Sequence, residues 1–319
     1  LKMEPTTAHF KAPPPKRKPT AAILAAFCIA AIVGVYGGYW AFAATRAGDV
    51  IRSWAEARQA EGLETTFAAM TTGGFPAWIR IDLASVVVAR AVGPRPWSWA
   101  TEKLSLRSRP WDFEHVLFDA SGIHRLSLGD ASSPRVYELT AGQLTGTVAR
   151  YCGSEVFLEV SVNSAGLELS DGVDSPLGHT VAQAELGLRV LRPVLPGPLA
   201  DALAIWRDAG GTLEVDRLTL AYGPLTLEAS GTVALDTGLQ PQAAFSARAE
   251  GVFKAVEELR ARRVIEIGDA LAARLTLTAL SKTPEGGGAA YLQVPLSIQE
   301  RTVYAGSVAL MRLPRMCWR

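Results

Sequence analysis

The stretch "YGPLTLEASGTVALD" (residues 222–236) decides the fold class of this 319-residue chain. Beyond the break at Gly223-Pro224, apolar residues fill every second position, and polar residues such as Glu228 stand between them. A period of two is typical of a β-strand that buries one face and exposes the other. The stretch therefore predicts a hairpin entered at the Gly-Pro break, followed by a strand. The positions on its apolar face are Leu225, Leu227, Ala229, Val233 and Leu235.

Runs of the same kind fill most of the chain on either side. "RVYELTAGQLTGTVAR" (135–150) and "VFLEVSVNSAGLELSDG" (156–172) alternate in this way, and Gly, Asp, Ser or Pro closes each run after about 10–15 residues. In residues 212–222 the apolar positions change from odd to even numbers, which predicts a β-bulge near Asp216-Arg217. The sequence thus predicts a mainly β fold of antiparallel, meander-like curved sheets with a few helices.

An uncharged segment, "AAILAAFCIAAIVGVYGGYWAFAA" (21–44), precedes the β runs. About 20 apolar residues span a hydrocarbon core as a helix, and Tyr and Trp gather where such helices leave the membrane. The basic cluster "KAPPPKRK" (11–18) favours a cytoplasmic N-terminus, with the large C-terminal part outside in the bacterial periplasm. Ala41-Phe42-Ala43 also fits a signal-peptidase site, so cleavage stays open as the alternative to an uncleaved inner-membrane anchor.

The helix expected after this anchor is a stalk, "GDVIRSWAEARQAEG" (48–62), in which Val50, Trp54 and Ala57 share one face. A composition break at "PVLPGP" (193–198) divides the β runs in two. The predicted organisation is a disordered basic tail over 1–19, a transmembrane helix over 20–44, a stalk helix over 45–62, a first β-rich half over 63–192, and a second β-rich half over 193–319 with helices near 198–209 and 252–280, the latter broken near Gly268.

Composition excludes one class of partner and leaves a disulfide open. The formal net charge is +1, and residues 1–19 hold five basic side chains against one acidic, so the remainder is slightly acidic. No basic field exists to attract nucleic acid. Of the three cysteines, Cys28 falls in the apolar segment, and Cys152 could pair with Cys317 in an oxidising compartment, although nothing in the spacing requires it.

The sequence predicts no catalytic, cofactor or metal site, and no enzyme. The four histidines stand singly and form no metal-ligand spacing. Gly-x-Ser-x-Gly and the glycine-rich phosphate loops are absent, and Gly286–Gly288 lacks the lysine and helix that a phosphate loop needs. Asp216, Glu228 and Asp236 occur on polar strand faces, where solvation or pairing with Arg217 or Arg248 is the default.

Two sets of residues are candidate binding surfaces. Leu225, Leu227, Val233 and Leu235 would line an apolar groove, if their face is not simply a closed core. Trp97, Trp99 and Trp111, with Pro96 and Pro110, would form an aromatic patch facing a lipid or a carbohydrate, but core filling is the favoured alternative.

A family resemblance covers the chain from about residue 34 onward. The order of "SWAEARQAEGLETTF", "TTGGFPAWIRIDL", "PWSWATEKLSL" and "RPWDF" is similar to domain-of-unknown-function family 2125 of alphaproteobacteria, and so is the terminal "VPLSIQERTVYAGSVALMRLP". The family supplies no catalytic residue to carry over. Residues 212–251 also resemble, more loosely, the C-terminal repeats of AsmA-like proteins, which are membrane-anchored β proteins implicated in envelope lipid handling.

Two functions of different classes follow. One is a non-enzymatic, membrane-anchored β scaffold that presents its apolar face to lipid in maintaining the envelope. The other is an accessory subunit that docks on an envelope protein in an inner-membrane complex by a strand edge or its helices. The lining of the apolar face discriminates between them.

Overall fold

The structure, a computed structural model, describes residues 19–60, 62–90, 96–129, 134–151, 153–170, 175–195, 197–283, 290–316 and 318. The predicted tail (apart from Pro19), Cys152, Cys317 and Gly286–Gly288 lie outside the described residues. The helices are α1 (Pro19–Ala60), α2 (Leu199–Asp208), α3 (Val252–Ala261) and α4 (Ile267–Leu280). The strands are β1 (Glu64–Thr66), β2 (Ala69–Gly73), β3 (Ile79–Arg90), β4 (Trp97–Arg109), β5 (Asp112–Asp119), β6 (Gly122–Leu128), β7 (Arg135–Arg150), β8 (Val156–Leu169), β9 (Thr180–Leu191), β10 (Thr212–Tyr222), β11 (Leu225–Leu235), β12 (Pro241–Glu250), β13 (Ser281–Lys282), β14 (Tyr291–Gln299), β15 (Thr302–Ala305) and β16 (Val308–Arg312).

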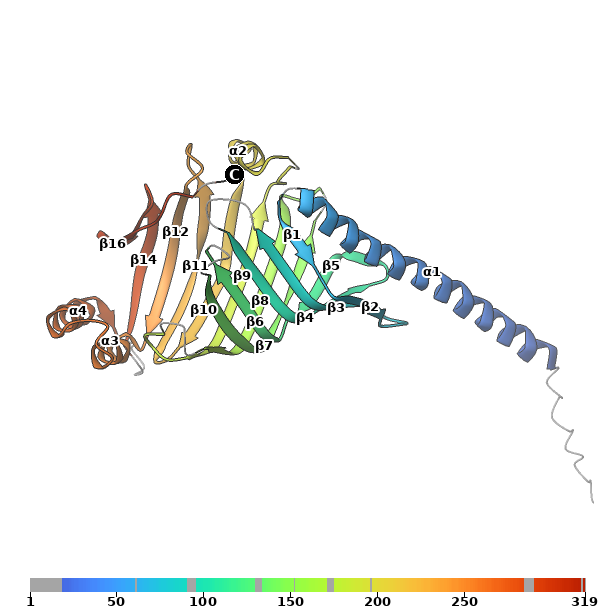
Figure 1. The fold of residues 1–319 in the computed structure, drawn as a ribbon, viewed down its shortest axis with the longest axis horizontal. Helices are drawn as coiled ribbons and strands as arrows, with labels where there is room; N and C mark the ends of the chain where they lie inside the picture. The colour runs from blue at the N-terminus through green and yellow to red at the C-terminus, as the bar shows by residue number, and fades with distance from the viewer. Residues whose placement is uncertain are drawn as a thin grey trace, which may run out of the picture.

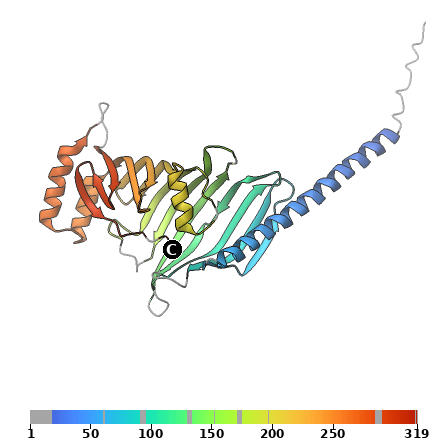
Figure 2. The ribbon, with the colours of Figure 1, turned by 90° about the horizontal axis from the view of Figure 1, so that it is seen from above.

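All the described strands belong to one antiparallel sheet, which confirms the predicted fold class. Neighbours in the sequence are mostly neighbours in space, as expected of a meander (Figure 1). The order departs from a simple meander at β5 and β6, which both lie between β4 and β7. Seen along the perpendicular direction, the sheet is strongly curved, and α1 projects from one end of it as a long rod (Figure 2).

The two predicted β-rich halves share this one sheet. β9, before the Pro-rich break, pairs with β10 along nearly its whole length, from Thr212 opposite Leu191 to Tyr222 opposite Val181. The break is followed by α2, which Pro198 precedes and Gly210-Gly211 follows. Trp206 anchors this helix to the sheet, because its indole Nε1 donates to the carbonyl of Leu191 at 2.8 Å and the ring packs over Gly211.

The anchor and the stalk, which the sequence analysis separated at residue 44, form one continuous helix in α1. The residues around the expected junction, "WAFAATRAG" (40–48), are Ala-rich and include no proline, so nothing interrupts the helix there. Its packing face also differs from the prediction. Val50 and Trp54 are exposed, whereas Ala43, Ala44 and Ala55 are buried, because these small side chains allow a close approach to the sheet.

The best-packed core lies between α1 and the first strands. Ala43 and Ala44 pack with Ile79, Ile81 and Leu83 of β3, and Trp40 and Ile51 flank this cluster. The large apolar side chains of α1 from Ile23 to Val35 are exposed. Among the described residues α1 is the one helix long and apolar enough to cross a membrane.

The second helical region is broken into two helices just before Gly268, close to the expected position. α3 ends at Ala261, and α4 begins at Ile267, so Gly268 lies inside α4 rather than between the helices. Arg263 adopts a left-handed backbone (φ 60°), which turns the chain after α3. The predicted β-bulge is confirmed, because the register of β10 against β11 shifts between Val215 and Leu218.

Candidate functional site: the apolar face of the sheet

A row of directly opposed apolar residues crosses ten strands of the sheet. We call it the central apolar row, and with neighbouring strands about 4.8 Å apart it extends for roughly 43 Å. Its members, from β3 to β14, are Ile81, Leu106, Phe118, Gly146, Val162, Leu186, Leu218, Ala229, Ala247 and Val294.

Parallel rows extend the same face to either side. One row runs from β5 to β15 through Val116, Val148, Val160, Leu188, Val215, Gly231, Phe245, Leu296 and Ala305. Another runs from β8 to β16 through Leu158, Val190, Leu213, Val233, Ala243, Ile298, Val303 and Met311. Because directly opposed residues point to the same side, these rows form one continuous apolar face.

The bulge in β10 keeps this face continuous. Leu213 and Val215 lie before it, Leu218 and Leu220 after it, and all four partner apolar residues of β11. Without an extra residue at Asp216-Arg217, a strict period of two would turn one half of β10 over. The switch of apolar positions from odd to even numbers in the sequence therefore marks the bulge that keeps all the apolar side chains of β10 on one face of the sheet.

The predicted groove residues belong to this face. Leu225, Leu227, Val233 and Leu235 all lie on β11 and are half-buried, while Thr226, Glu228 and Ser230 between them are exposed. The hairpin at Gly223-Pro224 is closed by Tyr222 opposite Leu225, as predicted. The structure therefore brings these four residues together on one surface.

Two glycines on the apolar face are covered by aromatic rings from the next strand. A Cβ at Gly146 would lie 2.5 Å from the Phe118 ring, and a Cβ at Gly231 would lie 2.5 Å from the Phe245 ring. A ring laid over a cross-strand glycine fills the gap that the missing side chain leaves. This pairing smooths the face, and the sequence alone did not reveal it.

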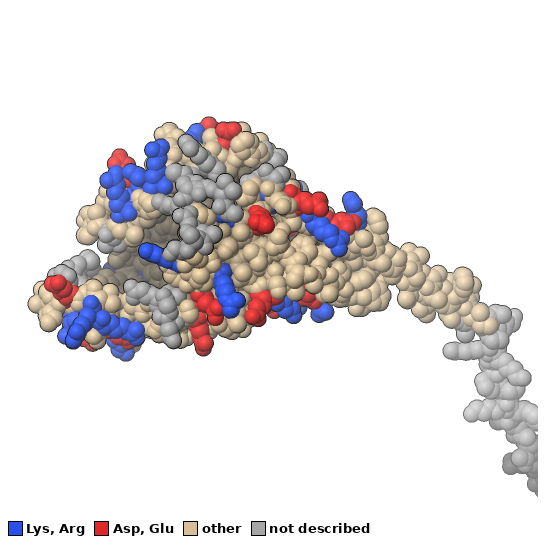
Figure 3. All heavy atoms as spheres, viewed as in Figure 1, with Lys and Arg blue, Asp and Glu red and all other residues tan. Residues whose placement is uncertain are grey.

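The face has no second sheet packed on it among the described residues. α1 covers it near β3, α2 lies at one end of the strands, and α3 and α4 lie together toward the other. Between these helical ends the molecule is hollowed, and the visible wall is mostly free of Lys, Arg, Asp and Glu, which gather at its edges (Figure 3). The side chains of the row in β8–β11 are accordingly only half-buried.

A cavity of about 320 Å³ lies where α1 meets the apolar face, and we call it the α1 cavity. The helix contributes Ala47, Val50 and Ile51, and β3 and β4 contribute Ile79, Ile81, Leu106 and Ser108. Arg46, Arg107, Phe113 and Val116 complete the lining. Ile81 and Leu106 are also the first two members of the central apolar row, so cavity and row are contiguous.

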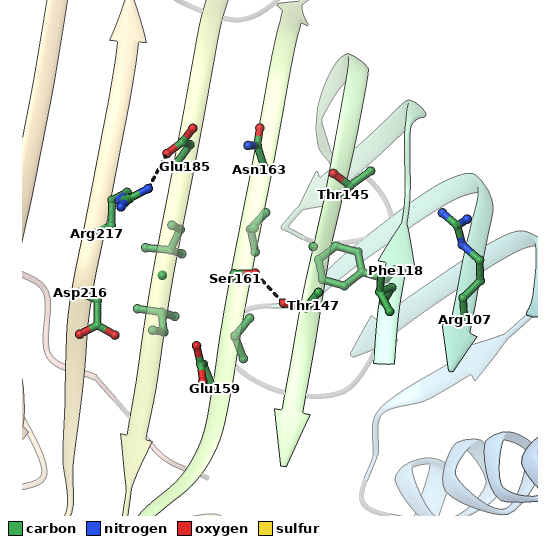
Figure 4. A pocket seen from close by; sticks show the side chains of 17 residues that line it. Arg107, Phe118, Thr145, Thr147, Glu159, Ser161, Asn163, Glu185, Asp216 and Arg217 are labelled. Carbon is green, nitrogen blue, oxygen red and sulfur yellow. Dashed lines mark hydrogen bonds and ion pairs between the residues drawn. The ribbon is translucent and has the colours of Figure 1, made fainter. Parts of the chain in front are cut away.

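The opposite face of the sheet is polar. The residues opposed along it from β2 to β14 are Thr71, Asp82, Ser105, Asp119, Thr145, Asn163, Glu185, Thr219, Glu228, Arg248 and Gln293. An open cavity of about 550 Å³ lies mainly over this face at β7–β10, and neighbouring strands place Thr147, Ser161, Glu185 and Arg217 around it (Figure 4). The sheet therefore has one polar face and one apolar face.

Several hydroxyl and charged side chains that line the polar cavity are paired with one another or with a neighbouring side chain. Thr147 and Ser161 share a hydrogen bond of 2.6 Å, so each hydroxyl is paired with the other rather than with a base. Arg189 donates to Asp216 from Nε at 2.7 Å, and this hydrogen bond holds the pKa of the Asp216 carboxyl below its usual range. Of the three carboxylates that the sequence analysis weighed, Asp216 and Glu228 lie on the polar face of the sheet. Asp236 instead follows the end of β11, where its Oδ1 accepts hydrogen bonds from the backbone N–H groups of Gly238 and Gln240.

His124 is the most unusual polar group of the apolar face. Its side chain is 2% exposed, it stacks on Trp99 with ring centroids 5.8 Å apart, and its Nε2 has no partner. Burial lowers the pKa of this imidazole, although the Ala120 backbone favours the charged form. The histidine is therefore held neutral at pH 7. Nothing in the sequence distinguished it from the other histidines.

The three candidate tryptophans do not form one patch. Trp97 and Trp99 lie near the start of β4, opposite Leu128 and Leu126 of β6. Trp111 lies in the turn after the other end of β4, where it is 59% exposed and its ring faces Arg109 at 6.0 Å. A strand of 13 residues separates the two sites, so Trp111 belongs to a different surface.

The described residues contain no group of three or more His, Cys, Asp or Glu side chains placed to hold a metal ion. His115 is engaged with Asp112 at 2.9 Å, and His179 lies 3.2 Å from the hydroxyl of Ser175. Cys28 is exposed on the first half of α1.

The comparisons with known proteins bear on identity rather than on activity. The family described as "Uncharacterized protein conserved in bacteria (DUF2125)" matches residues 40–151 and 138–314. No curated protein and no solved structure matches the chain. The matched segments cover α1 from Trp40, where it packs on the sheet, and almost the whole sheet. On this match, the chain belongs to family DUF2125.

Proposed function

We propose that this protein is a non-enzymatic, membrane-anchored scaffold that binds the acyl chains of lipids on the apolar face of its sheet. The observation that carries the proposal is the central apolar row, which crosses ten strands with no second sheet over it among the described residues. Such a contiguous apolar surface on a folded chain marks a binding site for an apolar partner. The looser AsmA-like resemblance of residues 212–251 supports the same function.

The proposed location is the inner membrane of a bacterium. α1 is long and apolar enough to cross a bilayer, and the basic residues before it favour retention of the N-terminus in the cytoplasm. The sheet would then lie in the periplasm. Protease added to spheroplasts should digest the β domain, and a β domain that is protected until the cells are lysed would contradict this orientation.

Photo-crosslinking tests the lipid site directly. The full chain is reconstituted in nanodiscs with a fatty acid that carries a diazirine, irradiated, and digested for mass spectrometry. Adducts on α1 are expected from the bilayer itself, so only adducts on the apolar face of β8–β12 count as support. Their absence would overturn the proposal.

Neighbouring residues of β11 supply a matched pair of variants. Ala229 points to the apolar face and is half-buried, whereas Ser230 points to the polar face and is exposed. Ala229→Glu places a carboxylate among apolar side chains and should abolish the adducts on β9–β12, while Ser230→Glu should leave them unchanged. Equal labelling of the two variants would contradict binding on this face.

A second candidate function, docking of an envelope protein, rests on α4. Ile267, Leu271 and Leu275 repeat every four residues on one side of this helix and are 75%, 60% and 66% exposed. An apolar stripe at this spacing is typical of a helix that packs on a partner. If this function is the correct one, a stoichiometric protein should co-purify in mild detergent, and Leu271→Glu should release it.

A further inference from the structure

Two turns of the sheet are tied to α1 in its uncharged segment. The phenol of Tyr36 donates to the carbonyl of Pro76 at 2.6 Å, in the turn between β2 and β3. The phenol of Tyr39 donates to the carbonyl of Pro110 at 2.7 Å, in the turn between β4 and β5. Trp40 adds a third bond, from its indole Nε1 to the carbonyl of Trp78 at 2.9 Å. These contacts therefore hold both turns beside residues 36–40 of α1.

That level falls within the length of helix needed to cross a bilayer. The uncharged segment begins at Ala21, and at 1.5 Å per residue Tyr36 lies roughly 23 Å further along the helix, against a hydrocarbon core of about 30 Å. The next charged residue after the segment is Arg46. Turns held at Tyr36 and Tyr39 consequently reach the boundary of the bilayer that α1 crosses.

The side chains on these turns are those of a membrane interface. Phe75, Trp111 and Phe113 are 53%, 59% and 48% exposed, although all three are large and apolar. The guanidinium of Arg109 lies 5.4 Å from the ring of Trp78 and 6.0 Å from the ring of Trp111. Aromatic rings concentrate at the headgroup level of bilayers, and a cation held among them suits lipid phosphate. The nearest carboxylate in the turn sequence, Asp112, is engaged by His115.

We propose that these five residues (Phe75, Trp78, Arg109, Trp111 and Phe113), here called the turn patch, form a second membrane contact that seats the sheet on the headgroup region of the bilayer. The proposal rests on the part of the proposed function in which α1 crosses the membrane, and it does not depend on acyl-chain binding by the sheet. Its occupant is the phospholipid surface, because the patch is continuous with a helix of membrane-spanning length and presents aromatic rings together with a cation.

Depth measurements on the full chain test the turn patch. In a chain whose three cysteines are replaced by serine, single cysteines for a nitroxide label are introduced by Trp111→Cys and Phe113→Cys. Val308→Cys supplies the matched control, because Val308 is 56% exposed but lies on β16, at the far end of the sheet from α1. Each chain is reconstituted in nanodiscs of phosphatidylcholine and phosphatidylglycerol, and collisions with oxygen and with a water-soluble nickel chelate are measured by electron paramagnetic resonance.

The nickel chelate should reach the labels at positions 111 and 113 at least about threefold less often than the label at position 308, because water-soluble reagents are depleted at the interface. Equal access at all three positions would overturn the proposal. A fourth chain that keeps only the native Cys28, which is exposed on the first half of α1, reports the anchor separately. If the label on Cys28 is shielded while the label at position 111 is open to water, only the turn-patch proposal is contradicted. If the label on Cys28 is itself open to water, the proposal that α1 crosses the membrane is contradicted as well.

Discussion

At the scale of the residue, Gly231 shows how closely neighbouring strands approach on the apolar face. A Cβ at this position would lie 2.2 Å from the carbonyl oxygen of Ala244 and 2.5 Å from the Phe245 ring. Gly231→Ala should therefore lower the free energy of unfolding by about 1–3 kcal/mol, as overpacking does elsewhere. Urea denaturation of the wild-type and variant full chains in detergent measures this difference in the free energy of unfolding.

The same substitution at Gly268 is the control. This glycine is exposed in α4, and a Cβ there would meet nothing within 4 Å. Gly268→Ala should raise the free energy of unfolding by up to about 1 kcal/mol, because alanine has the higher helix propensity. A loss of stability in both variants would mean that the contact with Phe245 is not the cause.

His124 predicts a dependence of stability on pH. Burial lowers the folded-state pKa of its imidazole from the ordinary value of 6.5, so the unfolded chain binds the proton more readily. Its contribution to stability is complete above the unfolded pKa and is lost as the pH falls through the folded pKa. The free energy of unfolding should thus decrease between pH values of about 7 and 5.

His124→Phe removes the titrating group but keeps a ring for stacking on Trp99. The variant should show a flatter profile over the same pH range in urea titrations at fixed temperature. The range stays above the pKa values of ordinary carboxyl groups, so Asp216 and Asp119 remain ionised throughout. Parallel profiles for the two chains would show that another group carries the pH dependence.

At the scale of the element, α1 is both a membrane-spanning candidate and part of the core. A chain that begins at Tyr36 keeps Trp40, Ala43 and Ala44 against β3, and one that begins at Arg46 lacks them. The shorter chain should lose about 3–5 kcal/mol of unfolding free energy, the range seen when a large core side chain is removed. Equal urea midpoints for the two chains would show that the packing of Trp40, Ala43 and Ala44 against β3 contributes little to stability.

The sequence predicted those elements well that depend on interactions between residues close together in the chain. The Gly223-Pro224 hairpin, the bulge after Val215 and the helix at 198–209 follow from turn chemistry and from alternation, which act over a few residues. The helix break, predicted near Gly268, falls at residues 262–266, where Arg263 takes up a left-handed turn while Gly268 itself is helical.

The packing face of α1 was missed for a physical reason as well. Large apolar side chains dominated the sequence pattern at Val50 and Trp54, but a helix that lies close to a sheet buries small residues such as Ala44 instead. Trp111 was predicted to lie in an aromatic patch, but with Trp97 and Trp99. Its actual surroundings could not be predicted, because the turns that α1 holds together are joined only in the tertiary structure, as Tyr36 and Pro76 are, 40 residues apart.

At the scale of the whole molecule, the question that the sequence left open was whether the apolar face is closed. Alternation specifies that β11 has an apolar side, and it cannot specify what packs there, because burial depends on elements far away in the chain. In the single sheet, the apolar side chains of β11 are half-buried.

One sheet also predicts one unfolding transition. Because β9 and β10 pair along nearly their full length, the two halves on either side of residue 193 cannot open separately without breaking that ladder. Hydrogen exchange followed by mass spectrometry should report the same opening free energy for β4 and β11. A lower value confined to the strands after β9 would instead indicate two cooperative units.

The α1 cavity and the central apolar row form one continuous apolar surface. Ile81 and Leu106 line the cavity and begin the row. A hydrocarbon chain that left the bilayer beside α1 would exchange one apolar neighbour for the next at every strand, about 4.8 Å per step, without crossing a buried charge. If lipid binds this face as proposed, every step along the row would exchange one apolar contact for a similar one, so the net movement of a chain would follow the lipid gradient between the two ends of the row.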